Sequence, residues 1–405
     1  MNKWQTYKLS DIADVQTGPF GSQLHQRDYV DVGTPCIMPC NIGANLDVQT
    51  DNIAHLKASD IIRLNKYCVK EGDIIYSRRG DIEKCAYINH LQEGWLCGTG
   101  CLRIRPNTSI CFPKYLAYLL STKESKKWIV ANAVGTTMLN LNSSILNTMP
   151  ISLPPLAEQK RIADILSAID DKIELNRRIN ANLEQQAQAL YKSWFVDNKK
   201  DDWKEVPLSE VADFVGGYSY KGNELVESSM TAMATIKNFE RKGGFKVDGF
   251  KDIVASNKLK AEHHANLFDI LVAHTDLTQN ADVIGNAEML LTFDKYSDII
   301  FSMDLVKVLP KQTFPYKYLL AALLKNPHFK KHCMGYVNGT TVLHMSKKAL
   351  PEYIVNLPSI EEIQSMDNAF KAYYLKMAEI LQENNSLSTL RDTLLPKLMS
   401  GEIKV

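Results

Sequence analysis

Two stretches of the chain place apolar residues at alternating spacings of four and three, which is the heptad pattern of coiled-coil helices. The first stretch, residues 156–196, contains neither glycine nor proline, and the second follows at an offset of 204 residues. We therefore predict two long antiparallel helices that form a coiled coil. The first seam consists of Ile162, Leu166, Ile169, Ile173, Asn176, Asn180, Leu183, Ala187, Leu190 and Trp194, and the second of Met366, Phe370, Tyr373, Met377, Ile380, Asn384, Leu387, Arg391, Leu394 and Leu398.

Three seam residues and one nearby proline are unusual for a coiled coil. Asn180 and Asn384 occupy matching positions, where paired polar side chains fix the register of a coiled coil at a cost in stability. Alternatively, both lie where the stripe drifts out of the interface, and the sequence favours neither interpretation. Arg391 has no evident acidic partner, which favours splayed helices or contact with another protein at that end. Pro396 argues against a regular helix beyond residue 395.

The rest of the chain is also duplicated, at an offset of about 200 residues. The segment from Leu9 to Asp14 returns as Leu208 to Asp213, and Gly135-Thr136-Thr137 returns as Gly339-Thr340-Thr341. Solenoid and propeller repeats have periods of about 20–50 residues. The much longer period therefore indicates two whole domains of similar fold.

Each globular part has short β-like runs separated by Gly, Pro and Asn, and one amphipathic helix. The two helices are predicted over Pro113–Ala131 and Pro315–Cys333. The fold class is therefore α+β. We expect a first globular domain over 1–153, a long helix within 154–198, a second globular domain over 199–357 and a second long helix within 358–405. The clearest strands are predicted at 72–76, 102–105, 269–272 and 304–308.

Composition is that of an ordinary globular protein, with 45% hydrophobic and 23% charged residues and a net charge of +1. A nucleic-acid-binding surface must therefore be a local patch. The first residues lack the apolar region of a secretory signal, and no apolar run is long enough for a membrane helix. We expect a cytoplasmic protein without membrane contact.

Seven of the eight cysteines precede residue 112. Cys36 with Cys40, and Cys97 with Cys101, have spacings that would suit a tetrahedral zinc site. The repeat argues against this site, because the second half has about Leu305 and Lys237 where Cys101 and Cys40 stand. We expect no metal and interpret these cysteines as small apolar residues.

Motifs for catalysis are missing. The chain has no Gly-Lys-Ser or Gly-Lys-Thr, so it lacks a Walker A loop, and no His-Glu-x-x-His. The glycines Gly98 and Gly100 are followed by Cys-Leu-Arg and do not complete a dinucleotide fingerprint. These absences favour a chain that is not itself an enzyme and binds no cofactor.

Several segments together resemble the specificity subunit of type I restriction–modification systems. They are Thr17-Gly-Pro-Phe-Gly-Ser22 followed by Gly33-Thr-Pro35, Gly72-Asp-Ile-Ile-Tyr-Ser-Arg-Arg-Gly80, Gly135-Thr-Thr137, Leu153-Pro-Pro-Leu-Ala-Glu-Gln-Lys-Arg-Ile162, and Leu395-Pro-Lys-Leu-Met-Ser-Gly401. Each segment is weak alone, but their order and duplication cover nearly the whole chain. The second helix departs from the pattern, because Ser359-Ile-Glu-Glu362 stands where the first has Pro155-Leu-Ala-Glu158.

The resemblance implies a sequence-specific DNA-binding subunit with two target recognition domains, each reading one half of a bipartite double-stranded target. It also implies that the helices bind two modification (methyltransferase) subunits, and that restriction subunits with translocase activity join them. S-adenosylmethionine, ATP and Mg²⁺ are then expected on those partners. The alternative from another class is a two-domain scaffold or adaptor that binds protein and not DNA.

Loops that differ between the repeats are the best candidates for reading bases, because two unlike half-sites need unlike side chains. Arg grips guanine and Gln grips adenine with two hydrogen bonds each. In the first domain the candidates are Ser22, Gln23, His25, Gln26, Arg27, Ser77, Arg78 and Arg79. In the second they are Tyr218, Ser219, Tyr220, Lys221, Lys237, Asn238, Arg241, Lys242, His274 and Thr275.

The run from Lys237 to Lys246 is interleaved with Phe239 and Phe245, which is typical of a phosphate-binding face. The repeated Gly-Thr-Thr segments are shared by both domains and so are poor candidates for reading different bases. We expect them to form structural turns or backbone contacts.

Overall fold

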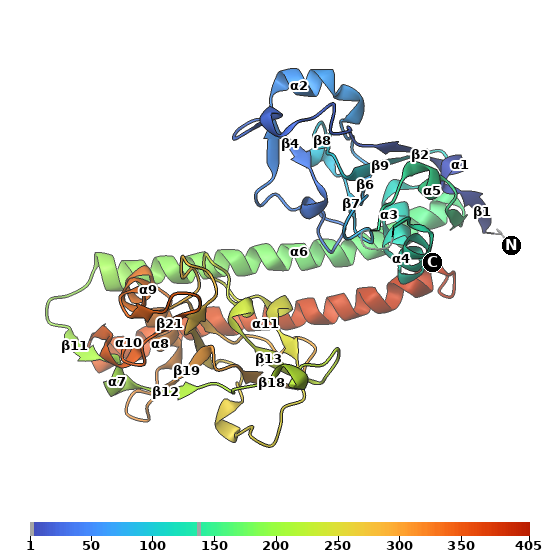
Figure 1. Cartoon of the computed structure of the whole chain (residues 1–405). Helices are drawn as coiled ribbons and strands as arrows, with labels where there is room; N and C mark the ends of the chain where they lie inside the picture. The colour runs from blue at the N-terminus through green and yellow to red at the C-terminus, as the bar shows by residue number, and fades with distance from the viewer. Residues whose placement is uncertain (1–3, 136–138) are drawn as a thin grey trace. The chain divides into compact units, whose positions relative to one another are not determined.

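The computed structural model describes residues 4–135 and 139–405, and Figure 1 shows the order of the elements. Thr136 and Thr137 of the first Gly-Thr-Thr segment lie outside the described residues. The chain divides into two compact units. The first comprises residues 1–172 and 388–405, and the second comprises residues 173–387. Each unit therefore contains one globular part and a portion of both long helices.

The first unit is built around a four-stranded antiparallel sheet of order β2-β9-β6-β7. Its middle strand β6 is buried along its whole length, since β-branched and aromatic residues fill both faces. The strands are β1 Gln5–Lys8, β2 Ala13–Thr17, β3 Tyr29–Val30, β4 Thr34–Ile37, β5 Ala54–Leu56, β6 Ile74–Ser77, β7 Cys85–Tyr87, β8 Leu96–Cys97, β9 Cys101–Pro106 and β10 Pro150–Leu153. The helices are α1 Leu9–Ile12, α2 Ala58–Arg63, α3 Pro113–Ser121, α4 Lys123–Asn132 and α5 Ser143–Asn147.

The second unit repeats this plan with a sheet of order β12-β19-β15-β17. Its strands are β11 Lys204–Pro207, β12 Ala212–Gly216, β13 Thr231–Ala234, β14 Lys251–Asp252, β15 Ile270–Ala273, β16 Thr275–Asp276, β17 Ala287–Met289, β18 Asp298–Phe301, β19 Leu305–Pro310, β20 Val337–Asn338, β21 Leu343–Met345 and β22 Ile354–Leu357. The helices are α7 Leu208–Val211, α8 Lys317–Leu324, α9 Pro327–Met334 and α10 Ala349–Glu352.

The two sheets confirm the α+β class and the internal repeat. The antiparallel pair β1–β10 of the first unit is matched by β11–β22 of the second. The four clearest predicted strands are found as β6, β9, β15 and β19. No helix in the described part of the chain is both long and apolar enough to span a bilayer.

The two predicted amphipathic helices are each broken, and the prediction of a continuous helix was wrong. α3 stops at Ser121 because Thr122 is extended, and its hydroxyl accepts a hydrogen bond from the Ser125 amide as an N-cap of α4. In the second unit Asn326 caps α9 in the same way, and Pro327 occupies the first turn. Local capping outweighs the continuous apolar stripe at both places.

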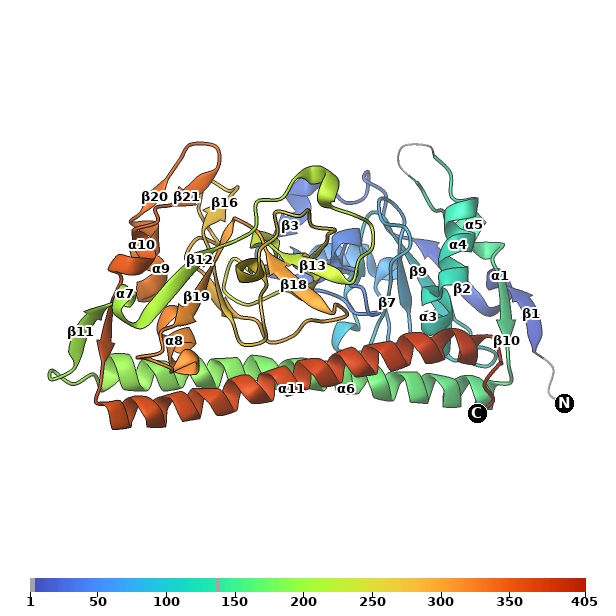
Figure 2. The same cartoon turned by 90° about the horizontal axis from the view of Figure 1, so that it is seen from below.

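The heptad stretches form the two long helices, α6 (Leu156–Lys192) and α11 (Ile360–Met399). Within the second unit they run antiparallel, since Asn176 contacts Asn384 and Asn180 contacts Met377 (Figure 2). The seam residue Phe370 is fully buried in the core that joins the helices to the second sheet. The apolar stripe therefore also holds the globular part.

The seam asparagines are buried or half-buried, but Asn180 and Asn384 do not pair with each other. Asn384 accepts a hydrogen bond of 2.9 Å from Asn176 Nδ2, and Asn180 donates to the Met377 carbonyl at 3.3 Å. Both open interpretations, a mutual pair or drift out of the seam, were therefore wrong. Antiparallel packing offsets the two helices, so that Asn384 meets a residue four positions before Asn180, and Asn180 meets a residue seven positions before Asn384.

We expect Asn176→Ala to lower the free energy of unfolding by about 1–3 kcal/mol, because the buried Asn384 amide loses its donor. Urea unfolding followed by tryptophan fluorescence measures this change. Asn182→Ala is the matched control, since Asn182 is exposed on the same helix. Equal losses for both variants would contradict a buried polar pair.

Pro396 does not end the second helix, so that prediction was also wrong. α11 continues to Met399, and the Ser400 amide donates to the Pro396 carbonyl at 3.0 Å. Leu398 and Met399 are buried against the first unit's core. Burial of these two side chains, worth about 1.5–3 kcal/mol each, offsets the hydrogen bond that proline cannot make.

Candidate nucleic-acid interface

A site at the end of strand β15 in the second unit gathers polar side chains from three short strands. His274 follows β15 directly, and its amide donates to the Asp304 carbonyl at 2.8 Å. Thr275 pairs in register with His344 of β21, and Asn338 of β20 pairs with His344 on the other side. Figure 2 shows this small sheet on the side of the second unit opposite α6 and α11. We call His274, Thr275 and His344 the second strand-end site.

The first unit has the same backbone arrangement at the end of β6. The Arg78 amide donates to the Gly100 carbonyl at 2.8 Å, and the Leu141 amide donates to the Arg78 carbonyl at 2.9 Å. Arg79 forms a β-bridge with Asn140. We call Arg78, Arg79 and Asn140 the first strand-end site. In the second unit, the Met345 amide donates to the His274 carbonyl at 2.9 Å, which corresponds to the bond from Leu141 to Arg78.

The two strand-end sites differ in chemistry although their backbones correspond. In the first, Arg79 is exposed and the half-buried Arg78 lies over the ring of Phe20, 5.8 Å from its centroid. Burial, and then the neighbouring Arg79, lower the pKa of Arg78. In the second, burial and the nearby His344 and Lys347 lower the pKa of His274, against a smaller opposing effect of Asp304. The first strand-end site thus carries the permanent positive charge of two arginines, whereas the second carries two imidazoles.

The loop that precedes β3 holds the other candidates of the first unit. Ser22, His25, Gln26 and Arg27 are exposed, and the Arg27 guanidinium lies 4.0 Å from Asp28. Gln23 differs, because its side-chain oxygen accepts a hydrogen bond of 2.7 Å from the Tyr67 hydroxyl. Its amide nitrogen alone is left for another partner.

Three predicted site residues have structural roles in the fold. Ser77 is buried and its hydroxyl donates to the Arg79 carbonyl. Tyr218 is buried with its hydroxyl bonded to Glu224 and Ser256. Asn238 is fully buried and bonds the Thr235 amide and the Lys246 carbonyl. Their neighbours Ser219, Lys221 and Lys237 are exposed, and Tyr220 is half-buried with Lys251 5.6 Å from its ring centroid.

The basic run from Lys237 to Lys246 does not present its aromatic residues to solvent. Phe239 and Phe245 contact each other in the core, with ring centroids 5.9 Å apart. Arg241 lies 3.6 Å from Asp282, and Arg241 and Lys242 line a cavity together with residues of α6. The aromatic residues of this run therefore pack together, whereas Arg241 and Lys242 lie beside α6.

Thr275 is also buried, with its hydroxyl 2.8 Å from an Asp304 carboxylate oxygen. Asn140 and His344 were missed by sequence reasoning, although both stand at an offset of 204 residues next to the Gly-Thr-Thr segments. Gly135 and Gly339 both have positive φ, and Gly339 lies in the connection between β20 and β21. The sequence signal for the two missed residues is a polar residue that differs between the repeats and follows a Gly-Thr-Thr segment that both repeats share.

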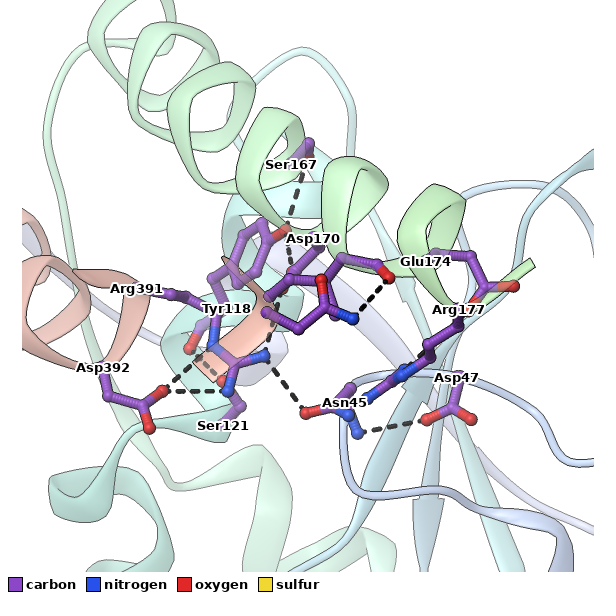
Figure 3. Close-up of polar contacts among 12 residues, drawn as sticks. Asn45, Asp47, Tyr118, Ser121, Ser167, Asp170, Glu174, Arg177, Arg391 and Asp392 are labelled. Atoms are coloured by element: carbon purple, nitrogen blue, oxygen red, sulfur yellow. Dashed lines mark hydrogen bonds and ion pairs between the residues drawn. The ribbon is translucent and has the colours of Figure 1, made fainter. Parts of the chain in front are cut away.

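Arg391 is tied into the first unit, which overturns the expectation of a splayed end or an outside partner. Its guanidinium lies 3.1 Å from Asp170 of α6 and 3.1 Å from the Asn45 side chain (Figure 3). Asp170 also accepts a hydrogen bond of 2.6 Å from the Tyr118 hydroxyl. The seam arginine thus fixes the helix pair to the globular part of this unit.

The second unit has its own ionic anchor, built from different residues. The Lys325 ammonium lies 2.5 Å from Glu184 of α6 and 2.5 Å from Glu288 of β17. The Gly244 amide donates to the other Glu288 oxygen at 2.6 Å. Burial raises the pKa of Glu288, although Lys325 opposes the shift. No sequence pattern indicates this cluster, because its members are far apart in the chain.

The described residues contain no group of three or more His, Cys, Asp or Glu side chains placed to hold a metal ion. Cys36, Cys97 and Cys101 are buried, whereas Cys40 is exposed. Burial raises the pKa of Cys36 to about 12. Cys36, Cys97 and Cys101 therefore pack as small apolar side chains.

Known proteins resemble this chain over its whole length. Residues 1–185 match the family described as type I restriction modification DNA specificity domain. The chain is 25% identical to the type I restriction enzyme HindI specificity subunit of Haemophilus influenzae, with 100% of both chains covered. It is 23% identical to the MjaIX specificity subunit of Methanocaldococcus jannaschii, covering 99% of this chain and 94% of that one.

A solved structure has the same fold. The S subunit of a type I restriction–modification system from M. genitalium superposes with a TM-score of 0.55 at 18% identity, covering 98% of this chain and 96% of that chain. The duplicated α+β domains and the paired long helices agree with this likeness. Residues 1–185 match this family's model, and over its whole length the chain is similar to type I restriction–modification specificity subunits.

Proposed function

We propose that this chain reads a bipartite double-stranded DNA sequence, one half with each globular domain, and carries out no chemistry itself. The observation that supports this most is the pair of strand-end sites. Equivalent backbone positions hold Arg78, Arg79 and Asn140 in one domain and His274, Thr275 and His344 in the other. A reader of two different half-sites needs one scaffold with different side chains at its contact points.

The side chains of the first strand-end site suit DNA contact. Arg79 is exposed and free to reach guanine O6 and N7 or a phosphate. Arg78 is held against Phe20, whose ring is 57% exposed, so the pair presents a cation and an aromatic face together. In the second domain the exposed His344, Lys347 and Lys348 provide donors on one edge.

The long helices are the proposed attachment surface for two modification subunits, with restriction subunits joining the complex. Large apolar side chains on α6 and α11 stay exposed on the described units although most of the seam residues of both helices are buried or half-buried. They are Ile165, Leu175, Ile360, Leu375 and Leu390. Exposed apolar residues on a helix that is already packed indicate a further protein partner. S-adenosylmethionine, ATP and Mg²⁺ would be held by those partners.

Mapping methylated adenines across the host genome, with and without this gene, tests the proposal. We expect methylation of one two-part sequence to disappear when the gene is deleted and to return when it is restored. Unchanged methylation after deletion would refute the proposal. The scaffold alternative predicts that the chain, even with modification subunits present, binds all duplexes of equal length equally well.

A further inference from the structure

The second strand-end site contains two imidazoles where the first has permanent cations and an amide. His274 is half-buried at the end of β15, and His344 is exposed on β21. The charged groups that act on His274 are His344 and Lys347 from the β21 side and Asp304 from the turn before β19. Asp304 is already engaged, because its carboxylate accepts a hydrogen bond from the Thr275 hydroxyl.

Imidazole is the side chain that gains or loses its charge near neutral pH, whereas arginine stays charged. A phosphate placed beside an imidazole favours the protonated form. Any DNA contact made by the second site therefore takes up a proton that the first site does not need. This difference follows from the two residue sets, which occupy corresponding backbone positions.

We infer that His274 and His344 form a proton-dependent DNA contact, so that the second strand-end site, unlike the first, binds DNA more tightly as the pH falls. The inference rests on the proposed function and adds to it a contact residue, His344, and a pH dependence that the first strand-end site lacks. Asn140 holds the equivalent position in the first domain and makes that contact independent of pH.

The sign of the effect follows from the free protein. Burial, His344 and Lys347 lower the pKa of His274, which favours the neutral imidazole in the unbound chain. DNA raises this pKa by adding a negative partner. Affinity then rises as the pH falls towards the pKa of the free imidazole, and levels off below it.

The test uses the full chain assembled with its modification subunits and a duplex that carries the genome-mapped target. Affinity is measured at about pH 6 and about pH 8, at constant ionic strength, since imidazoles titrate between these values. Two further duplexes have one or the other half-site scrambled. We expect binding of the intact duplex to be roughly three- to tenfold tighter at the lower pH.

The variant His344→Asn places in the second domain the residue that the first domain uses. We expect it to reduce the pH effect to about twofold or less, and His274→Asn combined with it to abolish the effect. His90→Asn is the matched control, because His90 is an exposed histidine of the first domain. It should keep the full pH dependence.

An undiminished pH effect in His344→Asn and in the double variant would overturn the inference. His344 is exposed, so the single variant carries the test even if the half-buried His274 cannot be replaced without unfolding. Failure of the proposed function looks different: the intact and scrambled duplexes would bind equally at both pH values.

Discussion

Replacement of Lys325 by alanine is expected to lower the free energy of unfolding of the second unit by about 3–5 kcal/mol. Its ammonium lies 2.5 Å from each of Glu184 and Glu288. Glu288 is 5% exposed, so the variant leaves a carboxylate in a site that water barely reaches. Chemical unfolding, followed by the fluorescence of Trp194 and Trp203, measures the loss.

A matched pair of variants separates the lost ion pair from lost packing. Glu288→Gln should cost less than Lys325→Ala, because burial already raises the pKa of Glu288 and favours its neutral form. Combining Lys325→Met with Glu288→Gln should recover part of the stability, since no buried charge then lacks a partner. An equal cost for Lys325→Met alone and for the combined variant would contradict an ionic anchor.

The raised pKa of Glu288 also predicts how the stability of the second unit changes with pH. A carboxyl group whose pKa is higher in the folded state than in the unfolded chain stabilises the fold at low pH and loses that contribution as pH rises through the folded value. Lys325→Ala removes the positive partner that limits the rise. The variant should therefore lose additional stability between mildly acidic and neutral pH.

Replacement of both Arg78 and Arg79 by alanine is the second large effect. Each arginine that contacts a base or phosphate contributes about 1–3 kcal/mol, so we expect the affinity for the target to fall by about 10²-fold or more. The loss should concern the first half-site only. Competition binding with duplexes that differ in one half-site measures it.

Arg178→Ala is the charge-matched control for this experiment. Arg178 is exposed on α6 and pairs with Glu174 on the same helix. Its removal changes the net charge as a single arginine variant does but leaves both strand-end sites intact. If Arg178→Ala and Arg79→Ala weakened DNA binding equally, the arginines of the first site would act only through overall charge.

The fold was predictable where a periodic pattern or the repeat carried it. The heptad seam locates α6 and α11, and short apolar β-like runs locate β6, β9, β15 and β19, because burial dictates both patterns. The breaks at Thr122 and Asn326 were not predicted, since a cap is decided by one side chain within an otherwise helical stripe. The partners of Asn384 and Arg391 depend on the offset between two helices, which one seam alone does not give.

The candidate site was predicted in part. Exposed Arg79 and half-buried His274 flank equivalent strands, but Ser77, Tyr218 and Asn238 proved to be buried and bonded within the fold. The same polar residue types occur on surfaces and, hydrogen-bonded, in cores. Sequence alone therefore does not tell an exposed polar residue from a buried one. Asn140 and His344 are placed at the two sites by pairing with Arg79 and Thr275, which precede them by more than sixty residues.

The most direct test of the central claim, that each domain reads its own half of one target, is adenine methylation mapping with domain-specific variants. Cells carry the modification subunits together with the unaltered chain, the Arg79→Ala variant or the His344→Ala variant. We predict that Arg79→Ala relaxes or shifts the sequence of one half-site only and that His344→Ala does so for the other half-site only. Changes in the same half-site for both variants, or in both half-sites for either one, would contradict the account.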